Sequence, residues 1–237
     1  MSRLDDPDVL RREYETEHRL VRRSLYDAAI YEGLDPREHA LLALFEARPR
    51  RVLDAGCGTG EFAERVARVL GVDVVGVDQS ERMVELTRAR GLEAHVADVR
   101  QLPFEDGELD AVSANWMLYH VADLDRALGE AARVLRPGGR LVAITNSMRH
   151  LEEIWGVDVA LGFSAENGAR ALERHFARVE RRDVGGGATF VTRENLRGYL
   201  AAFERLHGRD ETERLAALDV PLRATCRNAV FVADKAP

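Results

Sequence analysis

The sequence predicts an α/β protein in which helices cover both faces of a doubly wound, mostly parallel sheet. Two observations predict it. Apolar strand patterns alternate with helix patterns from about residue 51 to residue 146, and most of these strands end in an acid or an asparagine. Strand–helix–strand connections are right-handed and make the strands parallel. Because ligands of such sheets bind beyond the carboxyl ends of the strands, those polar residues are the first candidates for a site.

The first strand–turn–helix unit is RVLDAGCGTGEF, residues 51–62. Its apolar run ends at Asp54, and Gly56, Gly58 and Gly60 follow before a helix pattern begins. Glycine permits positive φ and removes the Cβ atoms that keep a ligand away from the backbone, and the first N–H groups of a helix can face a ligand. The segment therefore predicts a turn that binds a ligand.

The later elements follow in the same alternating order. Further strands are expected at residues 72–78, 93–99, 110–115, 140–146, 178–184 and 228–235. Helices are expected at residues 80–91, 123–135, 164–176 and 193–206, and a flexible glycine run at 185–187. The polar residues near the carboxyl ends of the central strands are Asp54, Asp78, Asp98, Asn115 and Asn146. The first 48 residues read as an N-terminal helical lid, followed by the sheet domain at 49–237.

Length and composition bound the class of protein. A chain of 237 residues can bury one substantial core, and a net charge of −7 argues against a broad nucleic-acid surface. No apolar run approaches the ~18 residues of a membrane helix, and the charged start does not resemble a signal peptide, so we expect a cytoplasmic protein. The seven histidines show no close metal-ligand spacing, and Cys57 and Cys226 do not indicate a disulfide framework. These features favour a small-molecule partner, with no metal, and leave the oligomeric state open.

The glycine turn allows two cofactors and a ligand-free alternative. Asp78 lies 22 positions after Gly56 and suits a ribose diol in either cofactor. A dinucleotide fingerprint has the spacing G-x-G-x-x-G, whereas here Gly56, Gly58 and Gly60 alternate. The carboxylate of Asp54 would repel a pyrophosphate but suits an ammonium group such as that of S-adenosylmethionine.

Four segments together resemble successive motifs of the class I S-adenosylmethionine-dependent methyltransferases, in the branch with ubiquinone and menaquinone biosynthesis enzymes. They are VLDAGCGTG, VVGVD, HVADVRQLPFEDGELDAV and EAARVLRPGGRLV. The resemblance is strong from about residue 50 to residue 147. It implies a Rossmann-like sheet of seven strands with an antiparallel last strand, and it makes residues 188–227 a helical insertion and substrate wall before that strand.

The resemblance also implies a role for each site residue. The residues around the methionine part of the cofactor would be Asp54, Gly56, Cys57, Gly58 and Gly60, with Asn115 and Trp116 near the methionyl end. The residues around the adenosine part would be Asp78 at the ribose hydroxyls, Gln79 and Met83 beside the adenine, and Asp98 and Val99 at its edge. Cys57 and Met83 have a plainer alternative as packing residues.

The acceptor side is less defined by the sequence. His120, near the end of the fourth expected strand, is a candidate general base, and a substrate-orienting role is the alternative. Tyr119, Trp155 and Phe190 are candidates for the acceptor wall. The expected reaction is methyl transfer to an oxygen, nitrogen or carbon nucleophile of a small metabolite. A non-catalytic cofactor-binding or partner-binding protein is the alternative, and a short-chain oxidoreductase is disfavoured because the only lysine, Lys235, cannot complete a Tyr-x-x-x-Lys pair.

Overall fold

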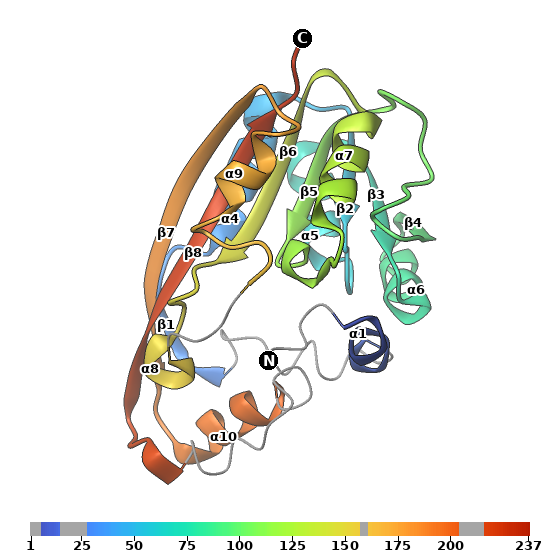
Figure 1. The fold of residues 1–237 in the computed structure, drawn as a ribbon. Helices are drawn as coiled ribbons and strands as arrows, with labels where there is room; N and C mark the ends of the chain where they lie inside the picture. Colours follow the sequence, from blue (N-terminus) through green and yellow to red (C-terminus); the bar gives the residue numbers. More distant parts are fainter. Residues whose placement is uncertain (1–5, 15–27, 157–160, 204–215) are drawn as a thin grey trace.

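A computed structural model describes residues 6–14, 28–156, 161–203 and 216–237 (Figure 1). Its sheet has eight strands in the order β1-β7-β8-β6-β5-β2-β3-β4. The strands are β1 (Ile30–Gly33), β2 (Arg51–Ala55), β3 (Asp73–Asp78), β4 (Glu93–Val96), β5 (Leu109–Asn115), β6 (Leu135–Asn146), β7 (Arg178–Phe190) and β8 (Leu222–Asp234). The described helices are α1 (Pro7–Glu13), α4 (Pro36–Ala47), α5 (Glu61–Leu70), α6 (Glu81–Ala89), η1 (Leu118–His120), α7 (Leu124–Val134), α8 (Glu152–Trp155), α9 (Gly168–Leu172) and α10 (Arg193–Ala201).

The predicted doubly wound sheet is confirmed. Strands β4, β3, β2, β5 and β6 pair in parallel, and β8 runs antiparallel between β6 and β7. The expected count of seven strands was wrong. Residues 30–33, which lie in the segment expected to be helical, pair with β7 as the antiparallel edge strand β1. This pairing depends on a contact far along the chain, so local periodicity does not reveal it.

Helix ends follow the capping signals of the sequence. The side chain of Ser80 accepts from the N–H of Met83 at the start of α6, and Asp123 accepts from Arg126 at the start of α7. The helix expected at 164–176 is reduced to α9. The hydroxyl of Ser164 accepts hydrogen bonds from the N–H groups of the second and third following residues, and this local turn replaces the first helical turn.

Alternate residues of the central strands fill two cores. In β2, Val52 packs with the cluster under α4 and α5, whereas Leu53 packs with the cluster under α7 and α9. Both side chains are fully buried. In Figure 1 these helices lie on the two faces of the sheet. Within the described part of the chain, no helix is long and apolar enough to cross a membrane.

Strands β7 and β8 extend past the parallel strands of the sheet. The last residue of β6, Asn146, pairs with Asn228, so residues 222–227 of β8 continue beyond the carboxyl edge, paired with residues 185–190 of β7 (Figure 1). The glycine run 185–187 is therefore strand rather than a flexible connector. A Cβ atom on Gly186 would lie 2.6 Å from the carbonyl oxygen of Glu32, so glycine lets β1 approach β7 here.

A third apolar cluster, which we call the cap cluster, packs on this overhang. Its buried members come from α8, α10 and the overhanging ends of β7 and β8. They are Leu151, Ile154, Trp155, Ala188, Phe190, Leu196, Tyr199, Leu200, Ala224 and Cys226. The span 188–227 thus holds two strand ends as well as α10, and its residues 204–215 lie outside the described residues. The cap cluster is therefore a separate small hydrophobic core on the carboxyl side of the sheet.

Candidate active site

The glycine turn joins β2 to α5 at the carboxyl edge. Gly56, Gly58 and Gly60 have φ values of 70°, 54° and 78°, in the region that side chains disfavour. The N–H groups of Gly56 and Cys57 donate to the carbonyl oxygen of Val77 in β3, at 2.7 and 3.0 Å. The turn is therefore fixed against the end of the neighbouring strand β3.

Two of these glycines are also required by packing. A Cβ atom on Gly56 would lie 2.9 Å from Cγ of Met117, in the segment after β5. A Cβ atom on Gly60 would lie 2.8 Å from Oγ1 of Thr87 in α6. The turn thus fits closely between the segments that follow β5 and β3.

Asp54 is a buried acid at the end of β2. Its side chain is 3 % exposed, and Oδ1 accepts a 2.6 Å hydrogen bond from Oγ of Ser113 in β5. Burial raises the pKa of Asp54 to about 7, the Ser113 hydrogen bond opposes this rise, and the charge of Asp78 adds to it. None of the described arginine, lysine or histidine side chains forms an ion pair with Asp54. A cationic group placed beside it would stabilise the carboxylate.

Asn115 ends the neighbouring strand β5 and has an unsatisfied side chain. Its Nδ2 and Oδ1 atoms are buried and make no hydrogen bond with any described residue. An unpaired buried amide is costly, which points to a partner supplied by a ligand. The next residue, Trp116, has a φ of 51° and is held by bonds from its N–H to Ile144 and from Nε1 to Oδ1 of Asn146. Backbone strain of this kind is concentrated at functional sites.

Asp78 ends β3 on the other side of β2. Its carboxylate accepts hydrogen bonds from the N–H of Gly58 at 3.0 Å and from the N–H of Ser80 at 2.9 Å. Burial raises the pKa of Asp78, and these backbone donors oppose the rise. Asp54, Asp78 and Asn115 therefore come together at the ends of three adjacent strands. The glycine turn lies where the sheet reverses its winding, between β2 and β5, which is where ligands of such sheets bind.

The residues expected near the adenine differ in their exposure and in their contacts. Gln79 is exposed, whereas Met83 on α6 is fully buried, as in its alternative role as a core residue. Asp98 holds the guanidinium of Arg100, with contacts of 2.6 to 3.1 Å, and this lowers the pKa of Asp98. Val99 packs against the core under α7 and α9.

Cys57 fits its alternative role as a packing residue. It is 7 % exposed, and its Sγ lies 3.4 Å from Oγ1 of Thr87. Burial and the charge of Asp54 raise the pKa of the Cys57 thiol to about 12. The thiol therefore stays protonated and is a poor nucleophile at neutral pH.

His120 lies at the end of η1, in the segment that follows β5. Its Nε2 lies 3.0 Å from the hydroxyl of Tyr14, and the ring of Tyr119 packs against it with centroids 4.5 Å apart. Trp155 and Phe190 lie in the cap cluster, where they are 7 % and 0 % exposed. Phe190 is therefore packed inside the cap cluster, and Trp155 is almost completely buried in it.

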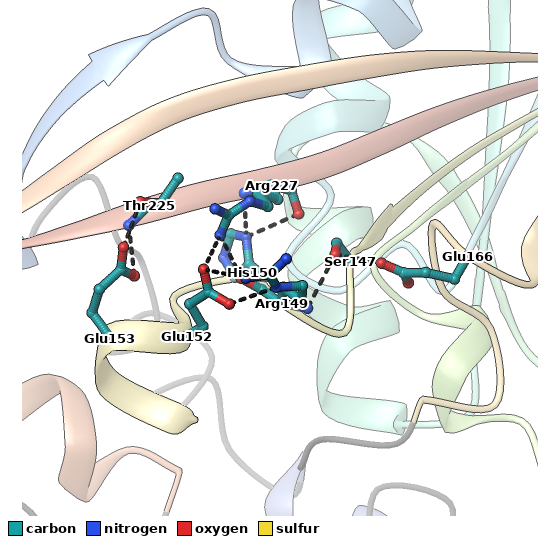
Figure 2. A network of polar contacts seen from close by, with 8 residues as sticks. All are labelled: Ser147, Arg149, His150, Glu152, Glu153, Glu166, Thr225 and Arg227. Atoms are coloured by element: carbon teal, nitrogen blue, oxygen red, sulfur yellow. Dashed lines mark hydrogen bonds and ion pairs between the residues drawn. The ribbon is translucent and has the colours of Figure 1, made fainter. Parts of the chain in front are cut away.

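A polar network lies beside the site, and no local pattern in the sequence predicts it. Figure 2 shows it between the loop after β6, α8 and the overhang of β8. Arg227 bonds both the carbonyl of Arg149 and Glu152, Glu153 accepts from Thr225, and Ser147 donates to Glu166. The backbone N–H of Arg227 lies 3.1 Å from Nδ1 of His150, and burial lowers the pKa of this histidine to about 4, so it is neutral at pH 7. The network fixes the cap cluster to the end of the sheet.

No group of His, Cys, Asp or Glu side chains that could hold a metal ion is found among the residues that the structure describes.

Comparison with known proteins identifies the family. A model described as a methyltransferase domain matches residues 53–143. Malonyl-[acyl-carrier protein] O-methyltransferase of Serratia marcescens is 30% identical over 223 residues, which cover 87% of this chain and 86% of that protein. Demethylmenaquinone methyltransferase of Thermus thermophilus is 43% identical over 115 residues, 46% of this chain and 52% of that protein.

Several other relatives match only in part. The first curated relatives align over 32% to 52% of their own lengths, so the chain spans about half of them or less. Among solved structures, the [4+2]-cyclase SpnF is 25% identical, with a TM-score of 0.60 and coverage of 96% of both chains. Together with the glycine turn and the acids at the ends of β2 and β3, these matches show that the chain belongs to the class I S-adenosylmethionine-dependent methyltransferases.

Proposed function

We propose that this chain transfers the methyl group of S-adenosylmethionine to an oxygen, nitrogen or carbon nucleophile of a small cytoplasmic metabolite. One observation carries the proposal. Asp54 has no cationic partner and Asn115 has no hydrogen-bond partner among the described residues, and both lie beside the glycine turn. The ammonium and carboxylate of an amino acid can satisfy both groups, because the ammonium is a cationic donor and the carboxylate accepts from an amide N–H.

The remaining assignments follow the order of the strands. The open turn of Gly56, Gly58 and Gly60 lets the methionine part approach the backbone, with Trp116 closing its far end. Asp78 would accept hydrogen bonds from the two ribose hydroxyls. Gln79 and Met83 would lie beside the adenine, with Asp98 and Val99 at its edge, and Asp98 can keep its bond to Arg100 because a carboxylate accepts several donors.

The bound cofactor supplies a methyl group on a positively charged sulfur. The residues of the chain have three tasks: they hold the acceptor nucleophile in line with that methyl, exclude water and remove the acceptor's proton where one must leave. His120 is the described imidazole in the segment after Asn115. We propose that it either removes the proton of the acceptor or orients the acceptor. Tyr119 and Trp155 are proposed for the acceptor wall, whereas the full burial of Phe190 favours support of that wall from within.

A small acceptor is supported by the name of one relative, demethylmenaquinone methyltransferase, and by charge, whereas the other named relative acts on an acyl group carried by a protein. The relatives named above act, by their names, on demethylmenaquinone and on malonyl-[acyl-carrier protein]. The net charge of −7 disfavours a nucleic-acid acceptor. The cap cluster, fixed by the network in Figure 2, would form the side of the site away from the adenine.

The direct test is a transfer screen with S-adenosylmethionine labelled in its methyl group. Extract fractions, phenols and carboxylic acids, free and as thioesters, are offered as acceptors, and labelled products are identified by mass. Calorimetry measures binding of S-adenosylhomocysteine and of NAD. Binding of NAD without binding of S-adenosylhomocysteine would contradict the cofactor assignment. Cofactor binding without label transfer to any fraction would favour the non-catalytic alternative or a reaction of another kind on the same fold.

A further inference from the structure

The end of α1 lies against the segment that carries His120. The hydroxyl of Tyr14, the residue that follows α1, is 3.0 Å from Nε2 of His120. The two rings meet edge to face, with centroids 5.8 Å apart and 74° between their planes. Tyr119 packs on the same imidazole with centroids 4.5 Å apart. The imidazole is thus held between a residue near the N-terminus and its own neighbour in the chain.

The backbone of Tyr14 is tied to a second part of the site. The hydroxyl of Ser80 donates a 2.7 Å hydrogen bond to the carbonyl oxygen of Tyr14. Ser80 caps α6, and its N–H donates to Oδ1 of Asp78. Tyr14 therefore connects the turn after β3 with the segment after β5. Because β2 lies between these strands, this one residue bridges the ends of the strands on either side of the glycine turn.

Among the described residues, the apolar contacts of α1 form a small cluster. Leu10, 3 % exposed, is the buried residue of a small cluster that also contains Val9, Tyr14, Leu161 and Phe203. None of these described residues belongs to the two clusters of the sheet core. A helix of seven residues is too short to be stable by itself, so its position depends on tertiary contacts. The two hydrogen bonds of Tyr14 are among the contacts that hold this helix at the site.

We infer that Tyr14 is a positioning residue for His120, and that α1 docks more firmly when the cofactor is bound. The inference rests on the proposed function, since it takes His120 as the group that faces the acceptor. The hydroxyl of Tyr14 fixes the direction of the imidazole, and the bond from Ser80 keeps that hydroxyl within reach. A cofactor held by Asp78 contacts the turn that anchors Tyr14, so cofactor binding and docking of α1 favour each other, as linkage requires.

The first test is Tyr14→Phe, which keeps the ring and removes the hydroxyl. The probe is S-adenosylhomocysteine, and the readouts are its Kd by calorimetry and the ¹⁵N NMR signal of His120 Nε2 in the complex. We expect that signal to leave its wild-type position and the Kd to rise roughly two- to tenfold, the range for one hydrogen bond. Tyr31→Phe is the matched control, because its hydroxyl bonds to Leu34 on the edge strand side, and both readouts should stay unchanged.

The second test compares Ser80→Ala with Ser80→Thr, which keeps the hydroxyl and the helix cap. Saturating S-adenosylhomocysteine should slow hydrogen exchange of the amides of residues 6–14 in the wild type and in Ser80→Thr, and this slowing should be largely lost in Ser80→Ala. An unchanged His120 signal in Tyr14→Phe, or equal protection of α1 in Ser80→Ala, would overturn the inference while leaving the proposed function intact. A wild-type protein that does not bind S-adenosylhomocysteine would overturn both.

Discussion

The hydroxyl of Ser113 in β5 lies 2.6 Å from Oδ1 of the buried Asp54 in β2. Neighbouring parallel strands thus supply an acid and the donor that lowers its pKa. Even with this donor, the pKa of Asp54 is about 7 because the group is buried. The acid therefore titrates near neutral pH, and a bound ammonium group would shift it toward the charged form.

Cofactor stabilisation should consequently depend on pH. The pKa of Asp54 is raised from 3.8 to about 7 in the folded protein, so its contribution to stability is complete below about pH 4 and is lost as pH rises through about 7. S-adenosylhomocysteine carries an ammonium group that compensates the ionised carboxylate. We expect its effect on Tm to be larger at about pH 8 than at about pH 6. Thermal unfolding at fixed ligand excess measures this, and a shift independent of pH would contradict it.

Asp54→Asn separates the charge from the shape of the site. The amide can still accept the Ser113 hydrogen bond, so the free variant should be at least as stable as the wild type at pH 8. Its affinity for S-adenosylhomocysteine should fall by roughly tenfold or more, since a charge-assisted contact is lost. Asp73→Asn, at the exposed start of β3, is the control for net charge. Unaltered affinity in Asp54→Asn would remove Asp54 from the cofactor site.

Asp78→Ala should weaken cofactor binding by roughly 1.5–3 kcal/mol, the range for hydrogen bonds to a charged group. The same substitution leaves the N–H groups of Gly58 and Ser80 without their acceptor, so a modest loss of stability is expected as well. Calorimetry and urea unfolding separate the two effects. A Kd equal to that of the wild type would exclude the ribose role.

Asn115→Leu tests whether the buried amide serves a ligand. Both amide atoms lack hydrogen bonds in the described structure, so an apolar side chain of similar size should leave the free protein as stable or make it more stable. Affinity for S-adenosylhomocysteine should fall. A large loss of stability with unchanged affinity would show that the amide has a structural partner instead.

Two glycines share a left-handed backbone conformation, so substituting each one separates the cost of that conformation from the cost of lost packing space. Gly60 and Gly71 flank α5 with φ values of 78° and 67°, but a Cβ atom meets Thr87 only at Gly60 and meets nothing within 4 Å at Gly71. Gly71→Ala should cost roughly 1–2 kcal/mol in the free energy of unfolding, from the conformation alone. Gly60→Ala should cost more and should also weaken cofactor binding. Equal unfolding midpoints in urea would refute the packing argument.

His120→Ala distinguishes a base from an orienting residue. If His120 takes the acceptor's proton, kcat should fall ~10²-fold or more with cofactor affinity nearly intact. If it only orients the acceptor, the loss should appear mainly in KM. A variant with unaltered kcat and KM would leave alignment and exclusion of water as the source of catalysis.

The local sequence determined the central half of this protein. The run of Val52 and Leu53 into Asp54, the alternating glycines and the acid at Asp78 each depend on residues close together in the chain, through strand alternation, backbone freedom and helix capping. Because parallel strands connected by helices align their carboxyl ends, these local signals were enough to place Asp54, Asp78 and Asn115 at the same edge of the sheet.

Only the tertiary structure decided what surrounds that edge. Three features join segments that lie far apart in the sequence. They are the strand β1, the strand conformation of residues 185–187, and the contact between Tyr14 and His120. A glycine run read alone favours a flexible loop, and it becomes strand here because β8 pairs with it on one side and β1 packs closely on the other. Likewise, the isolation of the Asn115 amide depends on which groups the fold places around it, and no pattern along the chain encodes the absence of a partner.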